Sequence, residues 1–242
     1  VHAPDIDSCT EGWEACRTAA RAACGQEKLL AGFMGTGIFE QCHFLMGFED
    51  TLTNLYEHPD EMRQLIEYIT EYRLRYVQLL IDHLQPDVIF SHDDWGTKDA
   101  LFMHPDMWRE FFKEPYRRFY GYIRSRGVIA IHHADSYLVP IVEDMAELGI
   151  QVWQGVLPEN DIPSLQRQLN GRLVLMGGMG AAIDRADAAP EADILTQIAG
   201  ALARGQQKRV LTLCRQALAQ GVAPQDILSG GLIQGMNRLG ED

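Results

Sequence analysis

The sequence lacks any long apolar run. No stretch approaches the ~20 consecutive apolar residues that a helix needs to span a bilayer, and the opening residues VHAPDIDSCTEGW have neither a basic end nor an apolar secretion signal. Basic residues are also scarce, since 21 Lys and Arg against 34 Asp and Glu give a formal net charge of −13. We therefore expect a cytoplasmic protein with no membrane or nucleic-acid partner, because phosphate binding requires clustered Lys and Arg.

Paired cysteine motifs are absent as well. The 242 residues contain five cysteines, an odd number with no CxxC spacing, which indicates neither a disulfide framework nor a zinc finger. What the sequence does contain is 46% hydrophobic and 23% charged residues, the composition of an ordinary globular protein.

Short β-like runs alternate with amphipathic segments over the first three quarters of the chain. The predicted strands are KLLAGFM (28–34), DVIFSH (87–92), VIAIHH (128–133), IQVWQG (150–155) and RLVLMGG (172–178). The predicted helices between and after them span residues 59–85, 104–126, 137–148 and 161–169. Strands separated by helices of this length predict βαβ units and a parallel sheet.

Polar residues gather just past the end of nearly every predicted strand, as in SHDDWG, HHADS, WQGVLPEND and MGGMG. This pattern favours a (β/α)8-type (TIM) barrel, whose active site lies at that edge, although an open α/β sheet also binds ligands there. Five predicted strands, where the architecture has eight, make the barrel incomplete. The remaining chain predicts three helices, at 190–204, 206–220 and 224–239, so we expect a partial barrel over 1–193 and an all-helical segment over 194–242.

The stretch AIHHADSYLVP (130–140) contains the most distinctive cluster. Alternate residues of a strand share a face, so His133 and Asp135 are expected together and His132 on the other side. An imidazole and a carboxylate so placed predict half of a metal site or an acid–base pair. The alternative is that these histidines only make hydrogen bonds in the core or in a loop.

SHDDWG (91–96) is the second cluster. Asp93 and Asp94 face different ways, and one of them is expected to point inward as a catalytic or substrate-orienting carboxylate. Turn formation and helix capping are an equally weighted alternative, because Asp readily accepts backbone N–H groups.

Four further residues at or beside the strand ends are candidates for substrate binding. The glycine-rich segments 32–47 and 176–180 lack the terminal Lys-Ser/Thr of a P-loop, so we expect their glycines to admit a bulky ligand or to form ordinary turns. The four candidates are Trp95, His132, Gln154 and Gly178.

Several of these segments together resemble the uroporphyrinogen decarboxylase superfamily, and within it the branch of corrinoid-dependent methyltransferases. The resemblance covers about residues 30–193. The segments that resemble the family are FLMGFEDTLTNLYEHPDEM, DVIFSHDDWGTKDALFMHPDMWREFFKEPYRRF, HHADSYLVPIVEDMAELGIQVWQGVLPENDIPSL and LVLMGGMGAAIDRADAAPE. It implies a (β/α)-barrel enzyme that moves a methyl group between a small methylated substrate or thiol and a corrinoid protein, as in methanogenesis or acetogenesis.

The resemblance also implies zinc. The branch binds zinc through a histidine, a cysteine two residues later and a further cysteine. The histidine position falls on His133 and the first cysteine position on Asp135, a harder oxygen ligand, while the later cysteine has no counterpart.

The tail, about residues 195–242, resembles the start of the helical cap that precedes a cobalamin-binding domain. No residue of this sequence matches the Asp-x-His-x-x-Gly loop that supplies the cobalt ligand, so the corrinoid is expected from a partner protein or another domain.

Two other functions remain open. The first is porphyrinogen decarboxylation in porphyrin biosynthesis, where His43 falls at the position of a family tyrosine and would contact substrate. The arginine-rich N-terminal motif of the decarboxylases is missing here, and a tetra-acidic macrocycle needs cationic clamps. The second is a non-catalytic partner of a corrinoid protein. An incomplete barrel with open edges is also expected to form homo-oligomers.

Overall fold

The computed structural model describes residues 2–8, 12–24, 28–178, 190–203 and 207–233. The chain divides into two compact units, Val1–Gly178 and Met179–Asp242, each with its own hydrophobic core. We describe each unit by itself. Among the described residues, no helix combines the length and apolar character that crossing a bilayer requires.

The first unit is built on a five-stranded, all-parallel sheet with the strands in sequential order. The strands are β1 (Ala31–Met34), β2 (Val88–His92), β3 (Ile129–His133), β4 (Val152–Val156) and β5 (Val174–Gly177). Sequential parallel strands joined by helices are the arrangement of a (β/α)-barrel, and the described residues form five of its usual eight strands. The predicted α/β class and incomplete barrel are confirmed.

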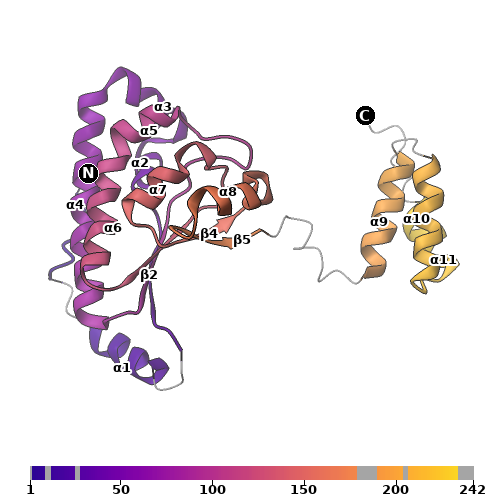
Figure 1. The fold of residues 1–242 in the computed structure, drawn as a ribbon, viewed down its shortest axis with the longest axis horizontal. Coiled ribbons are helices and arrows are strands. Elements are labelled where there is room, and N and C mark those ends of the chain that lie inside the picture. Colours follow the sequence, from indigo (N-terminus) through magenta and orange to yellow (C-terminus); the bar gives the residue numbers. More distant parts are fainter. Residues whose placement is uncertain (1, 9–11, 25–27, 179–189, 204–206, 234–242) are drawn as a thin grey trace. The chain divides into compact units, whose positions relative to one another are not determined.

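The helices of this unit lie before and between the strands (Figure 1). They are α1 (Trp13–Cys24), α2 (Ile38–Met46), α3 (Phe48–Glu57), α4 (Pro59–Leu84), α5 (Pro105–Trp108), α6 (Glu114–Ser125), α7 (Val142–Leu148) and α8 (Ile162–Leu169). A π-helical turn, Arg109–Lys113, joins α5 to α6, and two 3₁₀ turns, Val139–Ile141 and Pro158–Asn160, precede α7 and α8. Helices α4 and α5 begin with Pro followed by acidic residues, which suits a first turn with free N–H groups.

The two faces of the sheet have different surroundings. Met34, Ala130 and Trp153 are at most 1% exposed, because they point into the helix layer. Phe33, Val174 and Met176 point the other way and are 65%, 56% and 48% exposed. Parallel sheets are normally covered on both faces, so within this unit the second face is the uncovered wall of a barrel interior. We call these the covered face and the open face.

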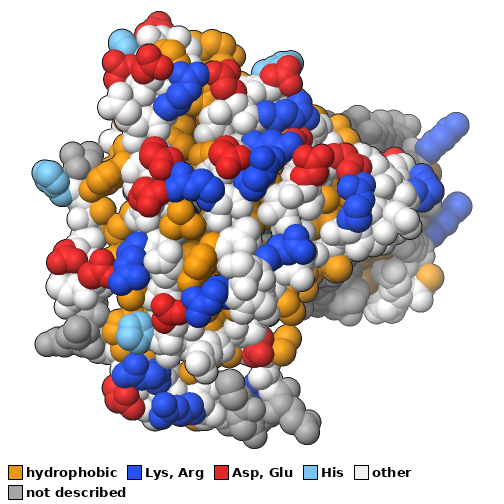
Figure 2. Space-filling model, turned by 60° about the vertical axis from the view of Figure 1, so that its left-hand side comes forward, with side chains coloured by type: hydrophobic (Ala, Val, Ile, Leu, Met, Phe, Trp, Pro, Cys, Tyr) orange, Lys and Arg blue, Asp and Glu red, His pale blue; other side chains and the backbone are white. Residues whose placement is uncertain are grey.

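The outer surface of the helix layer carries paired charges. Acidic and basic side chains lie side by side there (Figure 2), for example Arg118 with Glu67 at 2.8 Å and Arg126 with Asp82 at 2.8 Å. Such exposed pairs contribute little to stability.

The second unit is all-helical, as predicted. It contains α9 (Pro190–Ala203), α10 (Gln207–Ala219), α11 (Pro224–Asp226) and the π-helical segment Ile227–Ile233. Its apolar side chains pack into a small separate core centred on Ile198 and Ala217, both 0% exposed. Residues 234–239 of the third predicted helix lie outside the described residues.

Candidate functional site

The strand ends bring two histidines and a glutamine together on the open face. His92, His133 and Gln154 occupy one row across β2, β3 and β4. The two imidazole rings lie 4.8 Å apart, and Nδ1 of His133 is hydrogen-bonded to the Gln154 amide oxygen. In-register parallel strands bring these side chains to one rim, where a barrel has its active site.

Two carboxylates complete this cluster from outside the row. The Nδ1 atom of His92 lies 3.2 Å from an oxygen of Glu40, on α2, and its Nε2 atom lies 3.5 Å from an oxygen of Asp94. One ligand atom from each of the three residues can be chosen so that all lie within 4.8 Å of one another. We call Glu40, His92 and Asp94 the His–carboxylate cluster. All three side chains are of types that bind metal ions, and they belong to the described residues.

Asp93 points away from this cluster, into the core. Its carboxylate accepts hydrogen bonds from the N–H groups of Phe39 and Glu40 at 3.0 and 2.9 Å, from the Trp95 indole at 3.0 Å and from the Tyr116 hydroxyl. The two backbone donors belong to the first turn of α2, where N–H groups lack intrahelical partners. The geometry therefore supports the helix-capping alternative for Asp93 and leaves its carboxylate no surface for a substrate.

The environment of Asp93 changes its acidity. The pKa of this carboxyl is raised to about 6, chiefly by burial and also by the nearby charge of Glu40, against the lowering effect of the hydrogen bond from Tyr116. The carboxyl packs so closely on Gly37 that a Cβ at that position would lie 2.0 Å from Asp93. Only glycine fits between the capping carboxylate and the helix.

Asp94 lies on the open side of the same strand end. It is about a third exposed, and its Oδ1 accepts from the N–H of Asp135 at 3.2 Å and from the hydroxyl of Ser136 at 3.3 Å. These bonds tie the end of β2 to the loop after β3. Asp94 is thus the one of the two adjacent aspartates that is available to a ligand.

His133 and Asp135 do not form a pair in the described structure. His133 contacts His92 and Gln154, whereas Asp135 is exposed and no ion pair joins its carboxylate to either histidine. Strand β3 ends at His133, so the strand alternation that placed both residues on one side does not extend to Asp135. Metal binding by this pair stays a prediction.

His132 lies on the covered face, as its alternation with His133 predicts. Its ring stacks on Trp95 at 4.1 Å, its Nδ1 is 2.7 Å from the Tyr120 hydroxyl, and its Nε2 is buried without a hydrogen-bond partner. Burial, then the nearby charges of His133 and His92, lower the pKa of His132 well below its usual value. Both His132 and Trp95 are 0% exposed, so neither offers a surface to a substrate here.

The two other candidates lie away from the cluster. His43, on α2, packs edge-on against Phe39 at 5.4 Å and Phe48 at 5.8 Å in an aromatic group. Gly178 follows β5 with φ of 88°, in the left-handed region that favours glycine, and its N–H donates to the Val156 carbonyl at 2.7 Å. These contacts fit a packing role for His43 and a turn role for Gly178, and substrate binding by either stays a prediction.

Sequence reasoning missed Glu40 because segment 32–47 was expected to be a glycine-rich loop. The structure instead begins α2 right after Gly37, whose N–H donates to the Glu40 carboxylate at 3.1 Å. An acid three residues after a helix start is half of a capping box, and that spacing was the signal that could have identified the helix, although not the contact of Glu40 with His92.

Comparison with known proteins places the chain in a family. Residues 2–213 match the family described as uroporphyrinogen decarboxylase. The chain belongs to the uroporphyrinogen decarboxylase family. Residues 194–242 match a second family, described as B12 binding domain. Both resemblances recognised in the sequence are thereby confirmed, and because the two matches overlap over 194–213, the domain boundary at 193/194 stays a prediction.

A solved structure shares the fold. A methyltransferase from Methanosarcina mazei is similar with a TM-score of 0.59 and 21% identity over 78% of this chain. The chain spans 54% of the length of that methyltransferase, and at this identity the likeness concerns the fold alone. No curated protein matches the chain.

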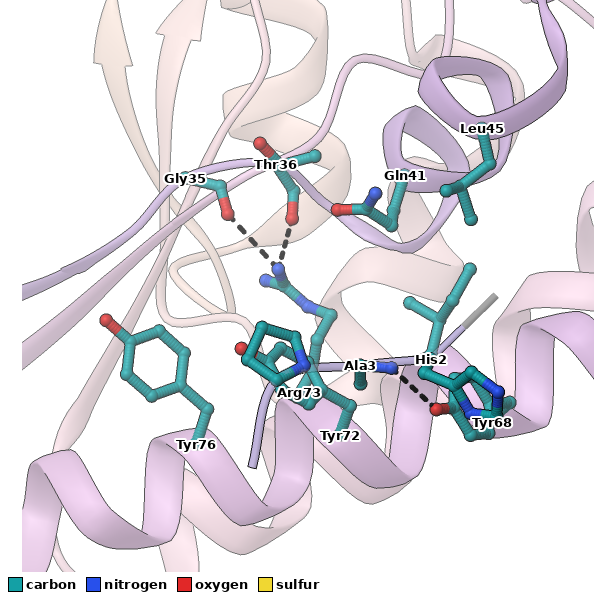
Figure 3. A pocket seen from close by; sticks show the side chains of 12 residues that line it. His2, Ala3, Gly35, Thr36, Gln41, Leu45, Tyr68, Tyr72, Arg73 and Tyr76 are labelled. Carbon is teal, nitrogen blue, oxygen red and sulfur yellow. Dashed lines mark hydrogen bonds between the residues drawn. The ribbon is translucent and has the colours of Figure 1, made fainter. Parts of the chain in front are cut away.

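The uroporphyrinogen decarboxylase unit also contains a cavity of about 400 Å³ between α4 and the loop after β1 (Figure 3). Arg73, 5% exposed, reaches across it and donates to the carbonyls of Gly35 and Thr36 and to the Ser91 hydroxyl. None of the predicted site residues lines this cavity. The hydrogen bonds of Arg73 hold the loop that leads into α2, so Arg73 helps to position Glu40.

Proposed function

We propose that this chain is part of a corrinoid-linked methyltransferase, which moves a methyl group between a small methylated substrate or thiol and a corrinoid. The observation that carries the proposal is the presence, in one chain, of a uroporphyrinogen decarboxylase unit and a segment of the B12 binding domain family. The fold shared with a methyltransferase is consistent with it.

The open rim of the sheet supplies the substrate site in this proposal. Asp94 accepts a hydrogen bond from the methyl-bearing group or offsets a positive charge on it. His133, whose ring is held by Gln154, donates a proton to the leaving atom or accepts one from the attacking atom. Holding the methyl carbon in line with its acceptor is the main contribution of such a site.

Two bound groups belong to the proposal. A corrinoid, supplied by a partner protein or another domain, provides cobalt as the methyl carrier. Zinc was expected at His133 and Asp135. The side chains that the described structure brings close enough to share a metal ion are instead those of the His–carboxylate cluster. A bound zinc ion would lower the pKa of a thiol acceptor, and His133 lies beside that cluster.

Decarboxylation of a porphyrinogen is the weaker candidate. Its tetra-acidic substrate requires cationic groups, whereas the rim offers Glu40, Asp94 and Asp135 with the two histidines His92 and His133. A binding partner of a corrinoid protein without catalysis is the third candidate.

The test measures the rate at which the full chain demethylates methylcobalamin in the presence of a thiol acceptor. The absorbance change of the corrinoid reports this rate. We expect His133→Ala to reduce the rate to background and Asp94→Asn to reduce it at least tenfold. His104→Ala, at a surface His–Asp pair, serves as the control and should match the wild type. Turnover of a porphyrinogen without any methyl transfer, or His133→Ala at the wild-type rate, would contradict the proposal.

A further inference from the structure

The His–carboxylate cluster contains two partly buried carboxylates that no arginine or lysine of the described residues pairs with. Several acids on the helix layer do lie beside arginine or lysine (Figure 2), and the buried carboxylate of Asp144 is paired with Arg109 and Lys113. Among the described residues, Glu40 and Asp94 form ion pairs with His92 alone. Two partly buried carboxylates that share one imidazole leave negative charge that a cation would offset.

We propose that Glu40, His92 and Asp94 bind one divalent transition-metal ion of the zinc class. Their ligand atoms come within 4.8 Å of one another, close enough for small side-chain adjustments to bring them around one ion. The proposal rests on the proposed function for the role of the metal and deepens it by naming the ligands, while its binding test is independent of methyl transfer.

Each ligand is held in place by the surrounding structure. Glu40 is 8% exposed, and its helix is fixed at the start by Asp93, whose carboxylate accepts the Glu40 N–H. His92 is the last residue of β2, paired in register with His133. Asp94 is oriented by the Ser136 hydroxyl. Ligands fixed by such second contacts lose little freedom when a metal binds.

The donor set indicates the class of metal. Imidazole favours zinc, iron, nickel or copper, whereas sites for magnesium and calcium are built from oxygen atoms alone. One nitrogen and two carboxylates therefore favour Zn²⁺ over Mg²⁺. Three protein ligands leave a coordination position open, the arrangement of catalytic rather than structural zinc. That position would lie beside His133, whose ring is 4.8 Å from His92.

The experiment is titration of the metal-free full chain with Zn²⁺ by calorimetry, together with the visible absorption of bound Co²⁺ as a reporter of its ligands. We expect one ion per chain, little competition from excess Mg²⁺, and at least tenfold weaker binding in His92→Ala and in Asp94→Asn. Asp94→Asn keeps an acceptor for Ser136, so its far-UV circular dichroism and unfolding curve in EDTA should match the wild type. The matched control is His104→Ala, which removes a histidine from an exposed pair with Asp106.

Three outcomes would overturn the proposal. Loss of binding in His133→Ala or Asp135→Asn, with His92→Ala unaffected, would move the metal to the pair expected from the sequence. Equal binding of Mg²⁺ would reject the zinc class, and unchanged binding in both cluster variants would reject the site. Metal binding without methyl transfer would leave this proposal standing while the proposed function fails, and the reverse result would separate them equally well.

Discussion

The covered and open faces of the sheet are formed by the same five strands, because neighbouring residues of each strand point to opposite faces. The covered row consists of Met34, Ser91, His132, Trp153 and Leu175. The open row, one residue earlier on each strand, consists of Phe33, Phe90, Ile131, Val152 and Val174. The first row contains polar groups and, apart from the half-buried Leu175, is buried by helices, whereas the second is wholly apolar and is uncovered within the unit.

This difference shows that residue type alone does not indicate which side of a parallel strand is buried. In the covered row, the Ser91 hydroxyl accepts from Arg73 and Nδ1 of His132 is hydrogen-bonded to Tyr120, whereas Nε2 of His132 is buried without a partner. The open row is apolar because, in a closed barrel, it lines a packed interior. Polar side chains on this face therefore occur at the rim, where His92 and His133 come two residues after Phe90 and Ile131 of the open row.

The largest expected effect is on the covered face. Trp153→Ala removes a side chain that is 0% exposed and donates to the Ala134 carbonyl at 2.9 Å. We expect the free energy of unfolding to fall by about 3–5 kcal/mol, the cost of a large core truncation. Urea unfolding followed by circular dichroism measures it, and a loss below about 1 kcal/mol would show that the helix layer is not packed as described.

The adjacent histidines provide the second comparison. His132→Ala should cost about 2–4 kcal/mol in unfolding free energy, because it empties a site against Trp95 and removes a hydrogen bond of the buried Tyr120 hydroxyl. His133→Ala, on the half-buried rim, should cost less than about 1 kcal/mol. Equal losses in the two variants would contradict the assignment of the histidines to opposite faces.

The third prediction concerns pH. The pKa of His132 is well below its usual 6.5 in the folded protein, so the unfolded chain binds this proton first as the pH falls. Stability contributed by the neutral ring is therefore complete above about 6.5 and is lost below it, by up to about 1.4 kcal/mol per pH unit.

The difference in unfolding free energy between wild type and His132→Gln isolates this effect. It should decrease as the pH falls below about 6.5, with a slope of at most about 1.4 kcal/mol per pH unit. Asp93, whose pKa is raised to about 6, acts with the opposite sign, but it is common to both proteins and cancels in the difference. Parallel stability curves for the two proteins would refute the buried neutral state.

The smallest effect is expected on the open face. Phe33→Ala changes a side chain that is 65% exposed, so the unfolding free energy should shift by no more than about 0.5–1 kcal/mol. Met34→Ala, at the next position but 1% exposed, should cost about 2–4 kcal/mol and is the matched comparison. If Phe33→Ala proved as costly as Met34→Ala, something would have to cover this face in solution.

Much of the fold could be predicted because each element has a strong local pattern. The five apolar runs and the long amphipathic segments appear as β1 to β5, α4 to α8 and the tail helices, within a few residues of their expected bounds. Helix α2 was missed because its one local signal, the Gly37–Glu40 capping box, lay in a segment interpreted as a glycine-rich loop, and its other cap, Asp93, lies 53 residues away. A contact of that sequence separation has no local pattern.

The site was predictable in part for the same reason. Strand alternation correctly assigns His132 and His133 to opposite faces, and adjacency correctly separates Asp93 from Asp94. The contribution of Glu40 could not be predicted, because it requires knowing that α2 packs over the end of β2. The roles of all these residues in catalysis stay predictions.

The alternation within β3 also restricts how this protein can vary in length. Loss or gain of a single residue between the turn at Gly127 and His132 would exchange the two imidazoles, sending the neutral, stacked ring to the rim and the rim ring into the helix layer. Insertions at Thr97–Ala100, in the exposed loop beyond β2, would leave both rings where they are. Length differences among relatives should therefore accumulate in that loop and avoid β3.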